Sequence, residues 1–416
     1  MPRRLIQSLP RPSDNRIAIQ LFPRAERAIA RGHPWLFAHG IKRQRRAGEP
    51  GDLAVLFDRD DRFLAVGLYD PLSPIRVRVL QHGRQATIDR TWFAERIAHA
   101  WRRRAPLLEQ STTGFRVVNG ANDGLPGVVI DRYSGTLVIK LYTHAWIPHL
   151  ATVVECMREV LEPESIILRL NRRMQAKVEH LHGLSDGAVL FGRAISGPTL
   201  FRENGLTFEA DVLRGQKTGF FLDQRDNRLL VEGLSRRRSV LNVFSYTGGF
   251  SVYAARGGAT EILSVDLSSR ALDVARRNFQ HNQSDKAVAA ARHHVIRGDA
   301  FAILSDLHDE GRAFDVVIVD PPAFAKASSD VENAIRSYQM LVRQGLGVMN
   351  PGGILVAASC SSRIDAQSFA RIVREAGGKA VRPLQLLDQT GHAIDHPISF
   401  PEGEYLTCVY ATDAPG

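Results

Sequence analysis

The chain has 416 residues, 44% of them hydrophobic and 24% charged, with a formal net charge of +10, and this balance excludes a largely disordered chain. Its length predicts two or three domains, because one domain usually holds about 100 to 200 residues. No stretch approaches the roughly 18 apolar residues of a membrane helix, and the first residues lack the apolar core of a signal peptide, so we expect a cytoplasmic protein without a membrane partner.

Most of the net charge lies at the start of the chain. Residues 1–47 contain eleven Arg and Lys against Asp14 and Glu26, a net charge of +9. Such an excess is typical of a segment that binds a polyanion, because Lys and Arg displace counterions from phosphates. RNA, DNA and an acidic membrane stay open on charge alone, as does a solvated basic face without a partner.

Residues 1–82 are predicted to form a small β-rich domain that carries this basic segment. "IAIQLF" has the pattern of a strand, and "AERAIARGHPWLF" that of a short helix running into a turn. "LAVLFDRDDRFLAVGLY" reads as a hairpin, and "SPIRVRVL" alternates as a further strand.

Residues 83–200 are predicted to form a central α+β domain. Apolar residues at helical spacing indicate one helix from Ile88 to Trp101 and another from Ile147 to Leu161. "GVVIDRYSGTLVIKLY" has the pattern of a hairpin, and "SIILRL" that of a strand. These apolar stripes are typical of a hydrophobic core, and the central domain offers no candidate catalytic or ligand-binding residue.

Residues 201–416 are predicted to form a Rossmann-like, doubly wound α/β domain. Short apolar runs without alternation, such as "VLNVF", "EILSVDL", "FDVVIVDPP" and "GGILVAASC", are separated by helical segments. Parallel strands covered on both faces read this way. Ligands of such sheets bind beyond the carboxyl ends of the strands, so the candidate site residues are sought there.

The first such end carries a glycine loop, made of Ser245, Tyr246, Thr247, Gly248 and Gly249. Glycines allow close approach of the backbone, and the amino end of the next helix can hold an anionic group. A tight turn without a ligand is the alternative.

Two carboxylates follow the loop at successive strand ends. Asp266 lies about twenty residues on, where it can accept hydrogen bonds from ribose hydroxyls, and Asp299 lies where an adenine amino group would be. Asp266 and the glycine loop together predict an adenosine-containing ligand, to which Asp299 adds a polar side chain. NAD stays open, although the strict G-x-G-x-x-G is absent, and so does a helix-capping role for Asp266.

The fourth strand ends in Asp320, Pro321 and Pro322. The prolines stiffen the exit from the sheet, so that Asp320 can face a planar base. Amino-directed methyltransferases commonly place an aromatic residue next, where this chain has Ala323. Phe324, one position later, is the candidate for stacking.

A cysteine ends the fifth strand. The three cysteines, Cys156, Cys360 and Cys408, lack the spacing of a zinc site or a disulfide framework, so we expect free thiols and no metal. Cys156 and Cys408 are predicted to be small buried hydrophobes. Cys360 lies among serines at the strand end, where a thiolate could act as a nucleophile.

Several of these segments resemble one family. "GQKTGFFLDQRDNR", "NVFSYTGGFSVYAA", "DPPAFAK" and "SCSS" are similar to the class I S-adenosylmethionine-dependent 23S ribosomal RNA cytosine-5 methyltransferases with an N-terminal PUA domain. "RGHPWLF" and "GLYDPLSPIRVRVL" resemble the PUA part, and "VNGANDGLPGVVIDRY" the central domain. The resemblance covers most of the chain.

The resemblance implies methyl transfer from S-adenosylmethionine to C5 of a cytosine in large-subunit ribosomal RNA. Cys360 would add to C6 of a flipped-out base, and Asp320 would hold the base's N3 or amino edge. By position, the loop, Asp266 and Asp299 would hold the cofactor.

Other residues are candidates for ligand contacts. Gln224 and Arg225 are predicted at the methionine end of the cofactor, and Lys217 and Lys326, with Pro321, Pro322 and Phe324, at the RNA. Family members with two catalytic cysteines carry the second directly after "DPP". Ala323 stands there, so the group that removes the C5 proton is unidentified.

Two other functions stay open. Guanine-N7 methylation needs no cysteine, because N7 already has a lone pair. A non-catalytic RNA-binding ribosome assembly factor would keep only the cofactor site. The partner expected in each case is ribosomal RNA, and the sequence leaves a homodimer open.

Overall fold

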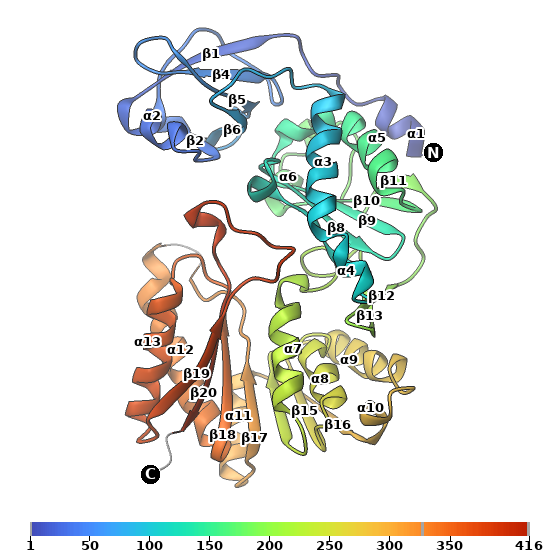
Figure 1. Cartoon of the computed structure of the whole chain (residues 1–416), viewed down its shortest axis with the longest axis vertical. Coiled ribbons are helices and arrows are strands. Elements are labelled where there is room, and N and C mark those ends of the chain that lie inside the picture. Colours follow the sequence, from blue (N-terminus) through green and yellow to red (C-terminus); the bar gives the residue numbers. More distant parts are fainter. Residues whose placement is uncertain (1, 326–327, 414–416) are drawn as a thin grey trace. The chain divides into compact units, whose positions relative to one another are not determined.

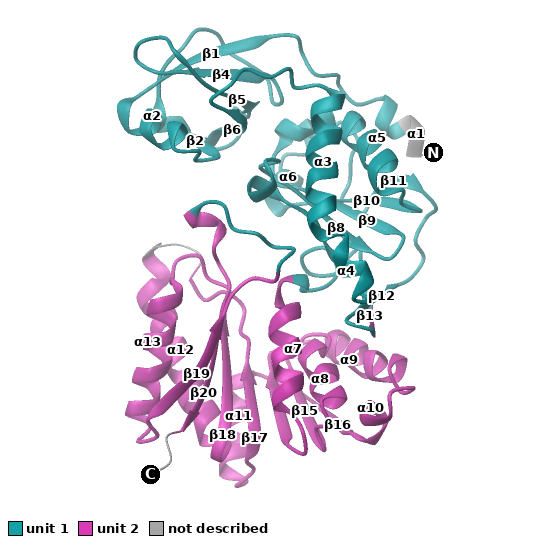
Figure 2. Cartoon of the chain, viewed as in Figure 1, with its two compact units in different colours: residues 1–205, 209–222, 394–400 teal, residues 206–208, 223–393, 401–416 magenta. Residues whose placement is uncertain are grey.

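The computed structural model describes residues 2–325 and 328–413, and the chain divides into two compact units. The first comprises residues 1–205, 209–222 and 394–400, and the second residues 206–208, 223–393 and 401–416 (Figure 2). No helix in the described part of the chain is both long and apolar enough to cross a membrane.

The first unit begins with a six-stranded sheet of order β2-β6-β5-β4-β1-β3 (Figure 1). All pairs are antiparallel except β1 and β4. Its strands are β1 (Arg16–Leu21), β2 (Trp35–Phe37), β3 (Ile41–Gln44), β4 (Leu53–Phe57), β5 (Phe63–Tyr69) and β6 (Ile75–His82). Helices α1 (Pro2–Gln7) and α2 (Pro23–Ala30) and the 3-10 turn η1 (Ala38–Gly40) accompany it. The expected hairpin over β4 and β5 is confirmed.

The first unit continues with a five-stranded sheet of order β11-β10-β9-β8-β7. Its strands are β7 (Gly114–Asn119), β8 (Val128–Tyr133), β9 (Thr136–Leu141), β10 (Ser165–Leu170) and β11 (Val189–Gly192). The helical segments are α3 (Arg90–Arg104), α4 (Pro106–Glu109), η2 (Gly120–Asp123), η3 (His144–His149), α5 (Leu150–Leu161), α6 (Arg172–Gln175) and η4 (Val178–His180). The helix expected from Ile147 begins at Leu150, because Pro148 lies in the 3-10 turn before it.

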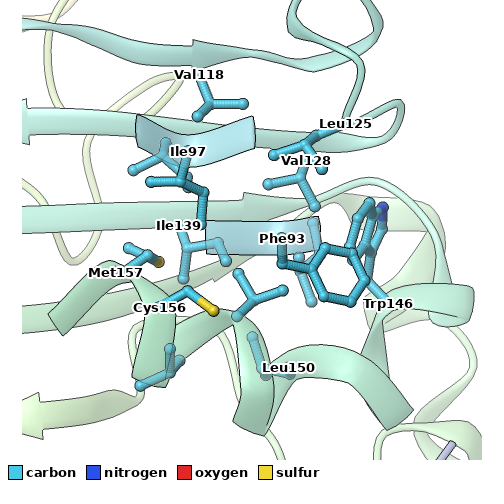
Figure 3. Packing of buried hydrophobic residues seen from close by; sticks show 14 of the residues in the cluster. Phe93, Ile97, Val118, Leu125, Val128, Ile139, Trp146, Leu150, Cys156 and Met157 are labelled. Carbon is cyan, nitrogen blue, oxygen red and sulfur yellow. The ribbon is translucent and has the colours of Figure 1, made fainter. Parts of the chain in front are cut away.

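One buried cluster joins the two sheets of the first unit. In the close view of Figure 3, Phe93 and Ile97 of α3 pack toward Trp146, Ile139 and Met157. The same cluster includes Leu53, Leu68 and Leu80 of the six-stranded sheet. The three-domain division at residues 82 and 200 stays a prediction. Strands β12 (Thr199–Glu203) and β13 (Leu206–Ala210) form a small pair that follows.

The second unit is built around a seven-stranded sheet of order β16-β15-β14-β17-β18-β20-β19, in which β20 is antiparallel to its neighbours. The strands are β14 (Ser239–Val243), β15 (Glu261–Asp266), β16 (Arg292–Arg297), β17 (Phe314–Val319), β18 (Met349–Ser359), β19 (Leu384–Thr390) and β20 (Thr407–Asp413). The expected doubly wound α/β domain is confirmed.

Helices cover both faces of this sheet. In Figure 1, α12 and α13 lie on one side of the strands, and α7 and α8 on the other. The helices are α7 (Arg225–Leu234), α8 (Gly249–Arg256), α9 (Ser269–His281), α10 (Lys286–Ala290), α11 (Ala300–Asp309), α12 (Val331–Gly347) and α13 (Ala366–Lys379), with 3-10 turns η5 (Leu222–Gln224), η6 (Ser328–Asp330) and η7 (Pro401–Gly403). Since β14, β15, β17 and β18 are parallel, their carboxyl ends meet at one edge.

Candidate functional site

The loop after β14 has an unusual backbone. Phe244, Tyr246 and Gly248 have φ angles of +60°, +47° and +74°, so left-handed residues occur at every second position. Non-glycine residues rarely adopt this conformation, and such outliers gather at ligand sites. Gly248 precedes α8 and meets α9 closely, since a Cβ built there would lie 2.9 Å from the Cβ of Ala275.

Two hydroxyls of this loop are suited to a polar ligand. Ser245 Oγ and Thr247 Oγ1 are buried and have no hydrogen-bond partner among the described residues. A buried polar atom without a hydrogen-bond partner destabilises the folded protein, so such atoms usually bind a ligand or a water molecule. The predicted position of Ser245, Tyr246, Thr247, Gly248 and Gly249 beside a strand end is confirmed, and their contact with a ligand stays a prediction.

Asp266 ends β15 and fixes the same loop. Its carboxylate accepts from the backbone N–H of Tyr246 at 2.8 Å and of Ser268 at 2.9 Å. Each carboxylate oxygen has a second lone pair, which leaves acceptor capacity for ribose hydroxyls. The orientation of Asp266 is therefore set by the loop that it would serve.

Asp299 lies two residues beyond β16, which ends at Arg297. It is exposed, and it caps α11 by accepting from the N–H of Phe301 at 3.0 Å and of Ala302 at 3.2 Å. This side chain thus has a structural role of its own, while contact with an adenine stays a prediction.

Gln224 and Arg225 stand at the start of α7 and are both buried. Gln224 Nε2 donates to Asp320 Oδ2 at 3.0 Å, so the side chain expected at the methionine end contacts the carboxylate of the "DPP" turn. Asn227 Nδ2 in turn donates to Gln224 Oε1 at 2.5 Å. Arg225 Nε donates to Asp226 at 3.1 Å.

The thiol of Cys360 lies beside the "DPP" turn. Cys360 follows β18, is partly exposed, and its Sγ lies 3.8 Å from the carbonyl oxygen of Pro321. Pro321 is buried and Pro322 exposed. The structure thus brings the two predicted catalytic residues, Asp320 and Cys360, to adjacent strand ends within one unit.

The buried side chain of Tyr338 contacts residues beside both Asp320 and Cys360. The Tyr338 hydroxyl lies 3.0 Å from Ser359 Oγ, and its ring meets Phe324 edge-on at 4.9 Å. Burial, and then the charges of Cys360 and Asp320, raise the pKa of Tyr338, so the hydroxyl stays protonated. Phe324 is thus partly engaged in the core, and its stacking on a base stays a prediction.

The other cysteines are poor nucleophiles. Burial raises the pKa of Cys156 to about 11 and that of Cys408 to about 12. All three cysteines are free thiols, as expected. Among residues 2–325 and 328–413, no cluster of His, Cys, Asp and Glu could hold a metal ion.

Of the two lysines predicted at the RNA, Lys217 lies within the described residues. Lys217 belongs to the first unit, has a φ of +53°, and holds its amino group 4.5 Å from the Phe221 ring centre. Lys326 lies outside the described residues.

The sequence does not indicate Asn227, Tyr338 or Thr390 as parts of the site. Each is a hydrogen-bonding residue within a helix or strand, where burial alone distinguishes it from a surface residue. Asn227 is three residues from Gln224 inside the "GQKTGFFLDQRDNR" motif, and this proximity is the only signal in the sequence.

Comparisons with known proteins agree with this geometry. A family model described as S-adenosylmethionine-dependent methyltransferase matches residues 182–391, and one described as PUA-like domain matches residues 19–82. The chain is 47% identical to a ribosomal RNA large subunit methyltransferase of Deinococcus radiodurans, over 97% of this chain and 99% of the relative. It is 36% identical to ribosomal RNA large subunit methyltransferase I of Aeromonas salmonicida, over 94% and 98%.

Solved structures show the same fold. A protein from Streptococcus mutans described as a SAM-dependent methyltransferase has a TM-score of 0.80 at 24% identity, over 95% of this chain and 99% of that one. Another structure, of a methyltransferase complexed with SAH, has a TM-score of 0.81 at 24% identity, over the same shares.

Proposed function

Since the chain belongs to the S-adenosylmethionine-dependent methyltransferases, we propose that it methylates C5 of a cytosine in large-subunit ribosomal RNA. The names of the relatives from Deinococcus radiodurans and Aeromonas salmonicida support this RNA as the substrate. The PUA-like domain at residues 19–82 and the basic start of the chain support RNA binding. A cytoplasmic location and a homodimer stay predictions.

The residues at the strand ends fit the cofactor. Ser245 and Thr247 supply buried hydroxyls that lack partners in the described structure, and both can hydrogen-bond a polar group of the cofactor. Asp266 would accept from the ribose hydroxyls, Asp299 would meet the adenine edge, and Gln224 and Arg225 are proposed for the methionine end. The bound cofactor supplies an electrophilic methyl group.

The position of Cys360 beside the "DPP" turn is the observation that supports methylation at C5. C5 of cytosine is a weak nucleophile. Addition of the Cys360 thiolate to C6 would form an S–C6 bond and move an electron pair to C5, so that C5 could take the methyl group while the methyl–sulfur bond of the sulfonium breaks and the neutral thioether leaves. Loss of the C5 proton to a base lets the S–C6 bond break and returns the thiolate. Covalent catalysis thus divides one difficult step into easier ones.

Asp320 is the partner of the base in this scheme. Its carboxylate is held by Gln224 at 3.0 Å and lies at the strand end adjacent to that of Cys360. It would hydrogen-bond the amino edge of the cytosine, accepting from the N4 amino group, or the N3 edge once N3 carries a proton. Pro321, Pro322, Phe324, Lys217 and Lys326 are kept as proposed RNA contacts.

A basic pocket of the first unit is a candidate path for the RNA backbone. The cavity has a volume of about 540 Å³ and lies between β6 and α3. Its lining includes Arg84, Arg96, Arg102 and His99 against one carboxylate, Glu95. Burial and then the charge of Arg84 lower the pKa of Arg96, a repulsion that a phosphate would relieve. This pocket adds basic residues that follow residue 47 in the chain to the candidates for RNA contact.

The test of the reaction type is Cys360→Ala, with Cys156→Ala as the matched control. Because the nucleophile is lost, we expect Cys360→Ala to bind S-adenosylmethionine within about threefold of the parent, while methyl transfer falls by at least about 10³-fold. Cys156→Ala should keep the parent's turnover. Both are measured with tritiated cofactor on ribosomal RNA, and by calorimetry.

Two other results would contradict the proposal. Turnover by Cys360→Ala close to that of the parent would favour guanine-N7 methylation, which needs no cysteine. Cofactor binding by the parent without methylation of naked RNA or of assembling subunits would favour the non-catalytic assembly factor.

A further inference from the structure

A line of hydrogen bonds runs through the second unit from the edge of the sheet to Asp320. Thr390 Oγ1 at the end of β19 donates to Asn227 Oδ1 at 2.6 Å. Asn227 Nδ2 donates to Gln224 Oε1 at 2.5 Å, and Gln224 Nε2 donates to Asp320 Oδ2 at 3.0 Å. Four side chains from β19, the start of α7 and the turn after β17 are thus connected in series.

The direction of this line is fixed by its last member. An ionised carboxylate only accepts hydrogen bonds, so Gln224 must turn its amide nitrogen toward Asp320. Its carbonyl oxygen then faces Asn227, which must present its own nitrogen. The Asn227 oxygen is left to accept from a hydroxyl, and Thr390 provides one.

Burial makes this direction costly to reverse. Asn227 is 0% exposed and Gln224 is 3% exposed. If either amide flipped, two oxygens or two N–H groups would face each other away from water, where unmet polar groups are expensive. The Tyr410 hydroxyl secures Asn227 further, donating to its backbone oxygen at 3.3 Å.

We propose that Asn227 and Thr390 are positioning residues, which hold the Gln224 amide with its nitrogen toward Asp320 and thereby orient the Asp320 carboxylate as an acceptor for the substrate base. The inference rests on the proposed function. An acceptor at this position matches the N4 amino group of cytosine, whereas O4 of uracil would face it with a second oxygen. The line would therefore contribute to the choice of base as well as to rate.

The decisive variant is Asn227→Asp, which has the same shape as the parent side chain. As a carboxylate it cannot donate to Gln224, so Gln224 must turn its nitrogen to residue 227 and its oxygen to Asp320. We expect kcat at pH 8 to fall about 10- to 100-fold, as for a lost hydrogen bond to a charged group. Cofactor affinity should stay within about threefold.

The variant's pH profile separates orientation from damage. Burial beside the carboxylate of Asp320 favours the protonated form of the introduced carboxyl, which is again a donor to Gln224. Its activity relative to the parent should therefore rise as pH falls from 9 to 6. Tyr410 and Cys408 of β20 also face this region, and burial raises the pKa of both, so they stay neutral in that range. Asp388 of β19 acts on both and would raise the pKa of the new carboxyl further.

A second pair of variants guards against misfolding. Thr390→Val removes the hydroxyl at nearly constant shape, and Thr390→Ser keeps it. We expect Thr390→Val to lower kcat about three- to tenfold with an unchanged KM for RNA, and Thr390→Ser to retain most of the parent's kcat. An equal loss in both variants would overturn the positioning role.

The outcomes distinguish this inference from the proposed function. Parent-like activity of Asn227→Asp at every pH, or a loss without recovery at low pH, would overturn the inference while the parent still methylates cytosine C5. Absence of C5 methylation by the parent enzyme would instead overturn the proposed function, and the inference with it.

Discussion

At the scale of single residues, the glycine loop after β14 combines a constrained backbone with side chains suited to a ligand. Gly248 combines a φ of +74° with a built Cβ only 2.9 Å from Ala275. Glycine adopts this conformation without a steric penalty, whereas a side chain would move the loop or α9. The same loop holds the two unsatisfied hydroxyls of Ser245 and Thr247 among the described residues.

Gly248→Ala should therefore weaken cofactor binding. We expect a loss of about 1 to 3 kcal/mol in the free energy of unfolding and about tenfold in affinity for S-adenosylmethionine, measured by denaturant titration and calorimetry. Gly233→Ala is the control, since nothing lies within 4 Å of its built Cβ and it sits in helix α7. That variant should bind the cofactor normally. Equal affinities in both variants would exclude a role for the loop's shape.

The sequence indicates some site residues and hides others for a physical reason. Cys360 and Asp320 are predictable because few side chains can act as a nucleophile or an anionic acceptor, and both stand at strand ends, where ligands of this fold bind. Asn227 and Thr390 are not, because an amide or a hydroxyl is common everywhere and only the three-dimensional contacts reveal its partners. Gln224 is predicted at the cofactor, and its contact with Asp320 is visible only in the structure.

At the scale of elements, helix α3 links the core to a basic surface. Phe93 and Ile97 face the buried cluster, while Arg96 and Arg102 line the pocket beside β6. Arg96 is held by Gln81 at 2.8 Å and lies 4.9 Å from the Trp92 ring centre. One amphipathic helix thus supplies both packing and the arginines proposed to contact phosphate.

Removing charge from this pocket should reduce the salt dependence of RNA binding. For Arg84→Gln with Arg102→Gln, we expect the slope of log K against log salt to become less steep by about 1.4 to 1.8, if each arginine contacts one phosphate. The control is Arg371→Gln with Arg374→Gln, which removes two exposed arginines of α13. A parent-like slope in the pocket variant would refute this path for the RNA.

At the scale of the whole molecule, the order of helices and strands along the chain is predictable from sequence. Which of them share a core or a compact unit is not. Strand and helix patterns depend on local periodicity, so the doubly wound sheet and the hairpins of the first unit follow from sequence. Which elements share a core depends on contacts between side chains that are distant in sequence. Leu53, Leu68 and Leu80 share one core with the five-stranded sheet, and residues 394–400 belong to the first unit. Removing residues 1–82 would expose this core, so charge substitutions are the cleaner test of RNA binding.

The central claim is that Cys360 forms a covalent bond with C6 of a cytosine. It is tested most directly by incubating the full-length protein and S-adenosylmethionine with 5-fluorocytidine-substituted ribosomal RNA, because fluorine at C5 leaves no proton to remove and blocks release of the thiolate. We predict a denaturation-resistant complex whose digested peptide carries a methylated nucleotide on Cys360, absent from Cys360→Ala. A parent enzyme that methylates the unsubstituted RNA but yields no such complex would contradict the account.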